Sequence, residues 1–473
     1  MKIENNRMKI NIENILLFLL MSIPVLACCY ILCPYSDPLK LIPLYFIEWI
    51  SISIAFYFLS YELGRKGPFL LSIIFILSFL ISAIVVSEIK KVYGTQWTGS
   101  DDLWYLNQAG KVIKHLNYNN GNLIKAWFEL VKTGSDAWSL AGWPFILGVV
   151  SFLFNSEPSL EFINGVALSL NATFITLVFI FIVNLLKEEI IKYPYVFLTI
   201  FILLVLDPLV FNGYSRKESS LHFSMILLFV FLCKIRIKWE FKWFIVGAFG
   251  ILGLITLRVV YIPLFLLASF LSFESKIKEM KFIKYLIAII LIGLFWGSIF
   301  NIELRDAPLR IWIMRDAISG GSGLGSTIYN IPIVGPVIYY AIAPPPVLPW
   351  KIATLDRMFT YLIRSFGSIV WFLSACYVVR GIFKKRELLK NNIFMFALIV
   401  FIGIFISAII ISDDPRYKQP SNFYLAIMMF LTWYSRYTKQ FSLSDGRSLA
   451  NIIQATPSRI RWRGGSPKGG SDG

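Results

Sequence analysis

Residues 393–411 read IFMFALIVFIGIFISAIII, an apolar run without a single charged side chain. An α-helix rises about 1.5 Å per residue, so this run comes close to the roughly 20 residues that cross about 30 Å of hydrocarbon. Comparable apolar runs recur along the chain, at 15–33, 69–86, 174–186 and 195–206. This recurrence predicts a protein built from membrane-spanning helices.

The composition agrees with this interpretation. Of the 473 residues, 57% are hydrophobic and 15% are charged, whereas a soluble domain carries about 25% charged residues. A large core alone does not explain so few charges, so lipid must replace water around much of the surface. The sequence also lacks the segments of alternating polarity that a transmembrane barrel requires. We therefore expect an all-α fold, a polytopic transmembrane helix bundle of about 12 spans with additional juxtamembrane surface helices.

The formal net charge of +17 comes from short clusters of lysine and arginine between the apolar runs. The clusters lie at 2–9, 65–66, 187–192, 234–242, 276–284, 380–390 and from residue 436 onward. In membrane proteins such clusters mark cytoplasmic loops. We therefore expect a multi-pass protein of the bacterial inner (cytoplasmic) membrane with both termini in the cytoplasm. We expect no nucleic-acid partner, because no basic domain stands apart from the spans.

One apolar segment, at 143–154, conflicts with this orientation if it crosses the membrane, because three basic clusters would then lie outside. The segment is short for a span, so we interpret it as a re-entrant or surface helix. The expected organisation is one transmembrane helical domain over 1–439, with outer loops at 89–140, 301–360 and 412–420. Residues 440–473 are expected to form a basic, disordered cytoplasmic tail.

The first outer loop contains two consecutive carboxylates, Asp101 and Asp102, directly after Ser100. One interpretation is structural: Ser100 caps a surface helix, and the helix dipole favours carboxylates in its first turn. The other is catalytic, with one aspartate acting as a general base at the lipid boundary. The pair could also hold Mg²⁺ or Mn²⁺ through oxygen ligands, or no cofactor is used.

The expected outer face also carries more cations than carboxylates. The candidate binding residues are Arg216, Lys217, Glu218, Arg258, Arg315, Asp414, Arg416 and Lys418. Arg258 stands alone between two apolar half-length segments, which is costly unless it meets an anion. Arginine binds a phosphate bidentately and lysine binds it as a point charge. This pattern predicts a site for an anionic lipid head group together with a hydroxyl-bearing substrate.

Six short motifs follow one another in a recognisable order. They are SDDLWYLNQAGKVIKHL (100–116), GWPFILGVVSFLFN (142–155), FINGVALSLNATFITLVFIFIVNLL (162–186), SRKESSLHFSMILLF (215–229), ITLRVVYIPLFLL (255–267) and DDPRYKQPSNFYLAIMMF (413–430). This succession resembles that of GT-C glycosyltransferases of the dolichyl-phosphate-mannose mannosyltransferase-like group. It departs from their pattern at Arg258, which is followed by Val259 where the family has proline.

The resemblance implies a transferase in cell-surface polysaccharide synthesis, working on the outer face of the inner membrane. It would move a sugar from a polyprenyl-phosphate carrier to a hydroxyl of a glycan or lipid acceptor. Asp101 or Asp102 would be the catalytic base, and Arg258, Arg416 and Lys418 would bind the leaving phosphate. Fixed cations suit that role, because negative charge develops on the leaving oxygens.

Two other functions remain open from the sequence. An O-antigen or polysaccharide polymerase also has about twelve spans and two large outer loops with essential arginines, and it joins glycans carried on polyprenyl diphosphate. A lipid-glycan flippase or transporter instead needs ionisable groups within the spans. The candidates for such groups are Glu48, Asp207, His222 and Arg364.

Overall fold

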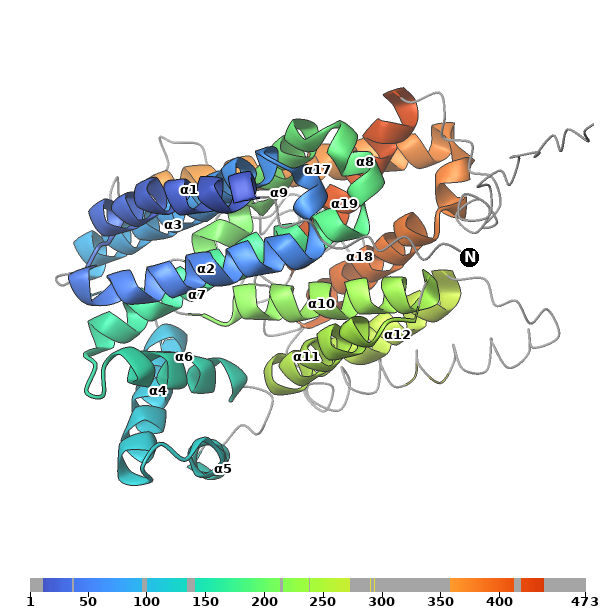
Figure 1. Cartoon of the computed structure of the whole chain (residues 1–473). Helices are drawn as coiled ribbons and strands as arrows, with labels where there is room; N and C mark the ends of the chain where they lie inside the picture. The colour runs from blue at the N-terminus through green and yellow to red at the C-terminus, as the bar shows by residue number, and fades with distance from the viewer. Residues whose placement is uncertain are drawn as a thin grey trace, which may run out of the picture.

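The computed structural model describes residues 12–35, 38–95, 100–133, 141–212, 216–237, 239–272, 358–411 and 418–437, together with residues 290 and 293. All regular structure in these ranges is helical, as expected (Figure 1). The α-helices are α1 Ile12–Leu32, α2 Ile42–Leu59, α3 Lys66–Tyr93, α4 Ser100–Tyr118, α5 Leu123–Thr133, α6 Gly142–Phe154, α7 Leu160–Leu185, α8 Lys187–Lys192, α9 Pro194–Asn212, α10 Glu218–Ile237, α11 Phe241–Leu257, α12 Tyr261–Ser272, α17 Met358–Lys384, α18 Asn392–Ile411 and α19 Ser421–Tyr437. Short 3-10 turns lie at Pro38–Leu41, Tyr61–Leu63 and Arg386–Lys390.

Six helical segments within the described ranges are long and apolar enough to cross a membrane. They are Glu13–Leu32, Pro38–Leu59, Lys66–Tyr93, Leu160–Leu185, Glu218–Arg236 and Met358–Lys384. Shorter apolar helices lie at Gly142–Phe154, Pro194–Val210, Phe241–Leu257, Tyr261–Ser272 and Asn392–Ala408. An all-helical bundle with helices long and apolar enough to cross a membrane is therefore confirmed in the described ranges. The expected number of membrane spans, about 12, stays a prediction.

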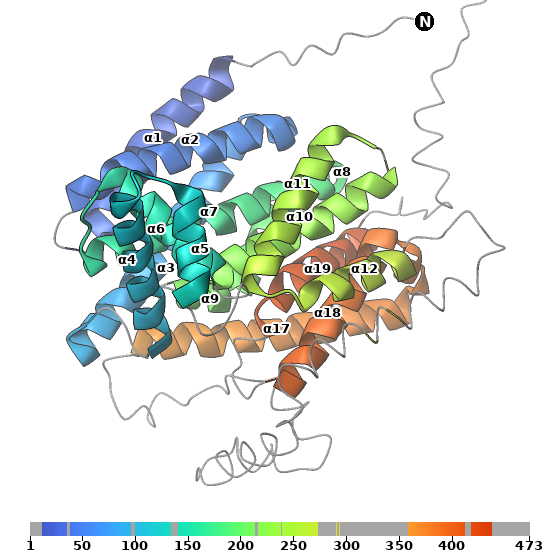
Figure 2. The same ribbon diagram turned by 90° about the horizontal axis from the view of Figure 1, so that it is seen from below.

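The bundle is organised around α7. This helix packs against α2, α3 and α10, and 89% of its most apolar window is buried, compared with 22% for α1. On α1 the side chains of Leu19, Ile23 and Ile31 are more than half exposed. An exposed apolar surface of this kind suits contact with lipid tails. Figure 2 shows α1 and α2 on one side of the bundle and α17 and α18 on the other.

Helices α10 and α11 approach each other closely because glycines line their contact. A Cβ added at Gly250 would lie 2.8 Å from the backbone N of Leu228 and 3.1 Å from the backbone O of Ser224. A Cβ at Gly253 would collide with the Ser224 side chain. Small residues at such positions allow two membrane helices to come into backbone contact.

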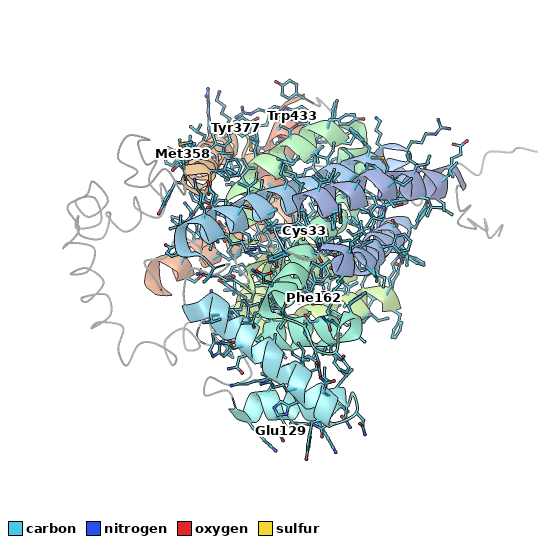
Figure 3. The ribbon with its side chains drawn as sticks, turned by 90° about the vertical axis from the view of Figure 1, so that its left-hand side faces the viewer. Cys33, Glu129, Phe162, Met358, Tyr377 and Trp433 are labelled. Carbon is cyan, nitrogen blue, oxygen red and sulfur yellow. The ribbon has the colours of Figure 1, made fainter. Side chains whose placement is uncertain are left out.

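Helices α4, α5 and α6 form a small unit at one end of the bundle (Figure 1). They share a separate hydrophobic core, with Val112 and Leu116 from α4 and Ala126 and Leu130 from α5. Figure 3 shows Glu129 of α5 at the far tip of this unit, away from Met358, Tyr377 and Trp433. Helices α4 and α5 lie within the loop expected at 89–140, and α3 extends to Tyr93 at its start.

The length of α6 agrees with the expectation for residues 143–154. Its 13 residues span about 20 Å, which is short of the roughly 30 Å of hydrocarbon. The neighbouring helix α5 exposes the apolar side chains of Leu123, Ile124 and Phe128. A short apolar helix beside an amphipathic one is typical of structures at a membrane surface. The position of α6 relative to the bilayer stays a prediction.

Candidate functional site

The acidic turn that carries Asp101 and Asp102 is the N-terminal end of α4, which begins at Ser100. Tyr105 and Leu106, one turn further on, are buried in the main core of the bundle. The N-terminal half of α4 therefore packs against the bundle, and the acidic turn lies there. Both aspartate side chains are outside the described part of the structure.

Lys217, at the start of α10, reaches the end of α11. Its Nζ donates a hydrogen bond of 3.0 Å to the backbone carbonyl of Leu257, and the residue is buried. Leu257 is the last residue of α11, so the ammonium satisfies a helix C-terminal carbonyl and complements the helix dipole. Arg258 follows directly in the chain and is half-buried. The structure thus brings Lys217 next to Arg258 and gives Lys217 a capping contact.

Lys418 lies in the turn before α19 and is 1% exposed. Its Nζ is 4.7 Å from the ring centroid of Trp371, a cation–π contact with α17. Burial lowers the pKa of the Lys418 ammonium to about 7, although Asp207 nearby acts in the opposite direction. Lys418 is therefore a buried cation held between α17 and the start of α19.

Asp207 of α9 is the centre of a buried polar cluster at this end of the bundle. Its Oδ1 lies 3.4 Å from Nε of Arg364 on α17, and its Oδ2 accepts a 3.2 Å hydrogen bond from Nε2 of Gln419. Gly367, one turn after Arg364, leaves room for this approach, since a Cβ there would lie 3.0 Å from Asp207 Cβ. Two of the four ionisable groups expected for a transport function therefore form an ion pair with each other.

A second carboxylate ties α3 to α17 at the same end. Glu88, near the end of α3, accepts hydrogen bonds of 2.9 Å and 3.0 Å from the backbone N–H groups of Phe359 and Thr360. These groups belong to the first turn of α17, where backbone donors have no partner within the helix. The carboxylate also complements the positive end of the α17 dipole.

Two titratable side chains one helical turn apart on α10, Glu218 and His222, have buried polar atoms. Oε2 of Glu218 and both ring nitrogens of His222 are buried without a hydrogen-bond partner. The His222 ring packs 5.0 Å from Phe423 of α19, and the two residues are four positions apart, on the same face of α10. Buried polar atoms of this kind are normally satisfied by water or by a ligand.

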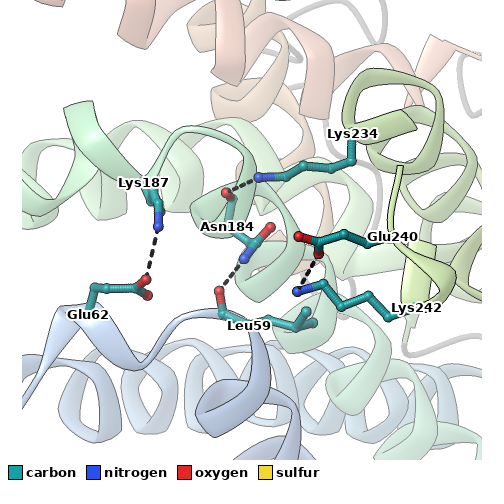
Figure 4. A network of polar contacts seen from close by, with 7 residues as sticks. All are labelled: Leu59, Glu62, Asn184, Lys187, Lys234, Glu240 and Lys242. Carbon is teal, nitrogen blue, oxygen red and sulfur yellow. Dashed lines mark hydrogen bonds and ion pairs between the residues drawn. The ribbon is translucent and has the colours of Figure 1, made fainter. Parts of the chain in front are cut away.

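The opposite end of the bundle collects the basic clusters (Figure 4). Lys187 forms an ion pair with Glu62 at 3.0 Å. Lys234 donates a hydrogen bond of 2.9 Å to the backbone carbonyl of Asn184. Lys242 forms an ion pair with Glu240. The clusters expected at 187–192 and 234–242 therefore lie together, beside the turn between α2 and α3. Lys385 also belongs to this end, since it bonds the Ser435 carbonyl near the end of α19.

Several expected site residues lie outside the described ranges. They are Arg315, Asp414 and Arg416, with most of the segments 301–360 and 412–420. Among the described residues, the sequence interpretation did not find Glu88 or Gln419. Glu88 lies close in sequence to the lysines at the end of α3, so the sequence does not distinguish it from the other charges there. Gln419 carries no charge and therefore does not stand out in an apolar sequence. Asp207 and Arg364 were visible as isolated charges in apolar helices, a pattern that indicates pairing.

No group of three or more histidine, cysteine, aspartate or glutamate side chains that could hold a metal ion occurs in the described part of the chain. Asp101 and Asp102 are not covered by this statement, because their side chains are not described. The chain has no match among protein-family models, curated protein sequences or solved structures. The described part of the fold defines a helical bundle in which six helices are of membrane-spanning length.

Proposed function

We propose that this protein is a membrane glycosyltransferase that uses a sugar carried on a polyprenyl phosphate. The observation that carries the proposal is the gathering of charged groups at one end of the bundle. The acidic turn of α4, the Lys217–Arg258 region and Lys418 belong to segments more than 300 positions apart in sequence. The opposite end holds the basic clusters that would face the cytoplasm.

The proposed chemistry assigns a role to each part of this end. Asp101 or Asp102 takes the proton of the acceptor hydroxyl, whose oxygen forms a bond to the anomeric carbon of the sugar. The bond between that carbon and the phosphate oxygen breaks, and the carrier phosphate leaves. Arg258, Arg416 and Lys418 stabilise the charge on the leaving phosphate, and Arg216, Glu218, Arg315 and Asp414 contact the glycan or the head group.

The fold suits a donor that cannot leave the bilayer. The apolar side chains that α5 exposes, Leu123, Ile124 and Phe128, would rest on the membrane surface and hold the α4–α6 unit at the lipid boundary. A lipid-borne sugar would then meet the aspartates at the boundary between hydrocarbon and water. In this arrangement the site faces the outside of a bacterial inner membrane and both termini face the cytoplasm.

The polysaccharide polymerase remains the alternative within the same substrate class, and a lipid-glycan flippase the alternative outside it. The pairing of Asp207 with Arg364 weighs against the flippase, because two of its candidate groups are explained by bundle structure.

The test is the lipid-linked glycan profile of a deletion strain carrying either the wild-type gene, the Asp101→Asn/Asp102→Asn variant or no gene. Absence of one sugar from the glycan, restored only by the wild type, supports the transferase. Shortened glycan chains would point to the polymerase, and carrier-linked glycan accumulating in the cytoplasm would point to the flippase. An unchanged profile in the deletion strain would exclude all three.

A further inference from the structure

A second polar cluster lies inside the bundle, apart from the charged end. Glu48 of α2 is 5% exposed and lies within the span Pro38–Leu59. Its Oε1 accepts a 2.8 Å hydrogen bond from the Ser169 hydroxyl of α7. Its Oε2 has no hydrogen-bond partner. This buried carboxyl group therefore has one oxygen with a hydrogen-bond partner and one oxygen without.

A second hydroxyl lies beside the Glu48 carboxyl group. Thr173 lies one helical turn after Ser169, on the same face of α7, and its side chain is close to the Glu48 carboxyl. The Thr173 hydroxyl is also buried without a hydrogen-bond partner. One carboxylate and two hydroxyls therefore lie together inside the bundle, with four oxygen atoms between them.

The surroundings supply no positive charge from the described residues. Glu48 forms no ion pair there, and the titratable side chains near it, Cys29 of α1 and Tyr45 of α2, carry no positive charge in either protonation state. An ionised carboxylate without a partner is very costly in hydrocarbon. The charge must therefore be neutralised by something that binds there.

We propose that Glu48, Ser169 and Thr173 form an intramembrane site for a single monovalent positive charge, delivered as a proton or as Na⁺. A divalent cation is unsuitable, because it would leave one positive charge uncompensated in the same apolar surroundings. Oxygen atoms of a carboxylate and of hydroxyls are the ligands that hard cations prefer. When the site binds a proton, the new O–H bond forms at Oε2 and donates toward Thr173. The proposal does not depend on the proposed glycosyltransferase function.

The test follows the protonation of Glu48 directly, in the full chain reconstituted into lipid bilayers. The carbonyl stretch of a protonated carboxylic acid is measured in the infrared difference between wild type and Glu48→Gln, from about pH 5 to about pH 10. Sodium chloride is compared with choline chloride. This readout needs neither enzyme activity nor access of a reagent to the site.

A carboxylic acid band that titrates within this range supports the site. Loss of the band on adding sodium at fixed pH identifies Na⁺ as the occupant, and insensitivity to sodium identifies the proton. Ser169→Ala and Thr173→Ala should shift the midpoint or the sodium effect. The matched control Thr176→Ala should not, because the Thr176 hydroxyl bonds the Ala172 carbonyl of its own helix.

Two results would overturn the proposal. A band absent at every pH in both salts would mean that Glu48 is an ordinary ionised carboxylate. A band of constant intensity at every pH and in both salts would mean a permanently protonated, purely structural group.

Discussion

Nε of Arg364 lies 3.4 Å from Oδ1 of Asp207, so two charges that stand in separate apolar helices neutralise each other inside the bundle. Asp207 is 4% exposed at its side chain and Arg364 is 19% exposed. Because Asp207 also accepts from Gln419, this single carboxylate connects α9, α17 and the start of α19. It thereby sets the position of the turn that carries Lys418.

Asp207→Asn should destabilise the protein by about 3 kcal/mol, because removing one partner of a buried ion pair leaves the other charge uncompensated. The measurement is the thermal unfolding midpoint of the detergent-solubilised protein. Adding Arg364→Met should recover part of the loss, since the half-buried guanidinium is then gone. Losses that simply add in the double variant would show that the two side chains do not interact.

Asp101→Asn should lower the rate of glycan transfer by roughly 10²–10⁴-fold, because asparagine keeps the shape of the turn but has no basic oxygen. If Asp101 serves only the helix terminus, the substitution is nearly silent, since asparagine is accepted there as well as aspartate. Asp102→Asn is the matched comparison. Full transfer by both folded variants would remove this turn from the chemistry.

Binding of the lipid-phosphate donor should weaken as the pH rises through about 7, where the buried Lys418 ammonium loses its proton. Lys418→Arg should abolish this pH dependence, because a guanidinium stays charged throughout. The donor affinity of both proteins is measured from about pH 6 to about pH 9, with Lys132→Arg on exposed α5 as the control. An identical fall in wild type and Lys418→Arg would assign the titration to another group.

The lowered pKa of Lys418 also predicts how the stability of the folded protein depends on pH. Lysine in the unfolded chain titrates near 10.4, and in the folded chain Lys418 titrates at about 7. The burial penalty is therefore complete below about pH 7 and disappears as the pH rises toward about 10. Between about pH 7 and about pH 10, the stability of the wild-type protein should rise relative to that of Lys418→Met, because methionine carries no charge at any pH.

Gly250→Ala should destabilise the protein by roughly 1–3 kcal/mol, since the new methyl group meets the backbone of α10 at Leu228 and Ser224. Gly110→Ala is the matched control within a helix. A Cβ at Gly110 has open space around it, and alanine is the better helix former by up to about 1 kcal/mol. Unfolding midpoints that move in the same direction for both variants would contradict the close packing of α10 and α11.

The two ends of the bundle should lie on opposite sides of the membrane. In a cysteine-free background, an impermeant thiol reagent added outside should label Lys132→Cys on α5 and should not label Trp239→Cys beside the basic clusters. Both positions are well exposed. Outside labelling of Trp239→Cys alone would reverse the proposed orientation.

The sequence by itself determined the fold class and the grouping of the charges. Apolar runs such as 393–411 become helices because hydrocarbon offers no partner for backbone polar groups, so each segment must satisfy its own. The basic clusters at 187–192 and 234–242 meet at one end of the bundle. The reason is that helices of similar length alternate in direction and return these loops to the same side.

Only the tertiary structure decided which polar groups meet. Asp207 and Arg364 are separated by 157 positions, and Glu88 and Thr360 by 272. Local sequence determines that a helix forms and which face is apolar, but not which neighbour covers that face. Lys217 was expected to bind substrate, and in the structure its ammonium donates a hydrogen bond to the Leu257 carbonyl. The Lys418 ammonium makes a cation–π contact with the Trp371 ring. Such contacts depend on how the helices pack. The favourable energy of a hydrogen bond, an ion pair or a cation–π contact is gained only when packing has brought both side chains together and out of water.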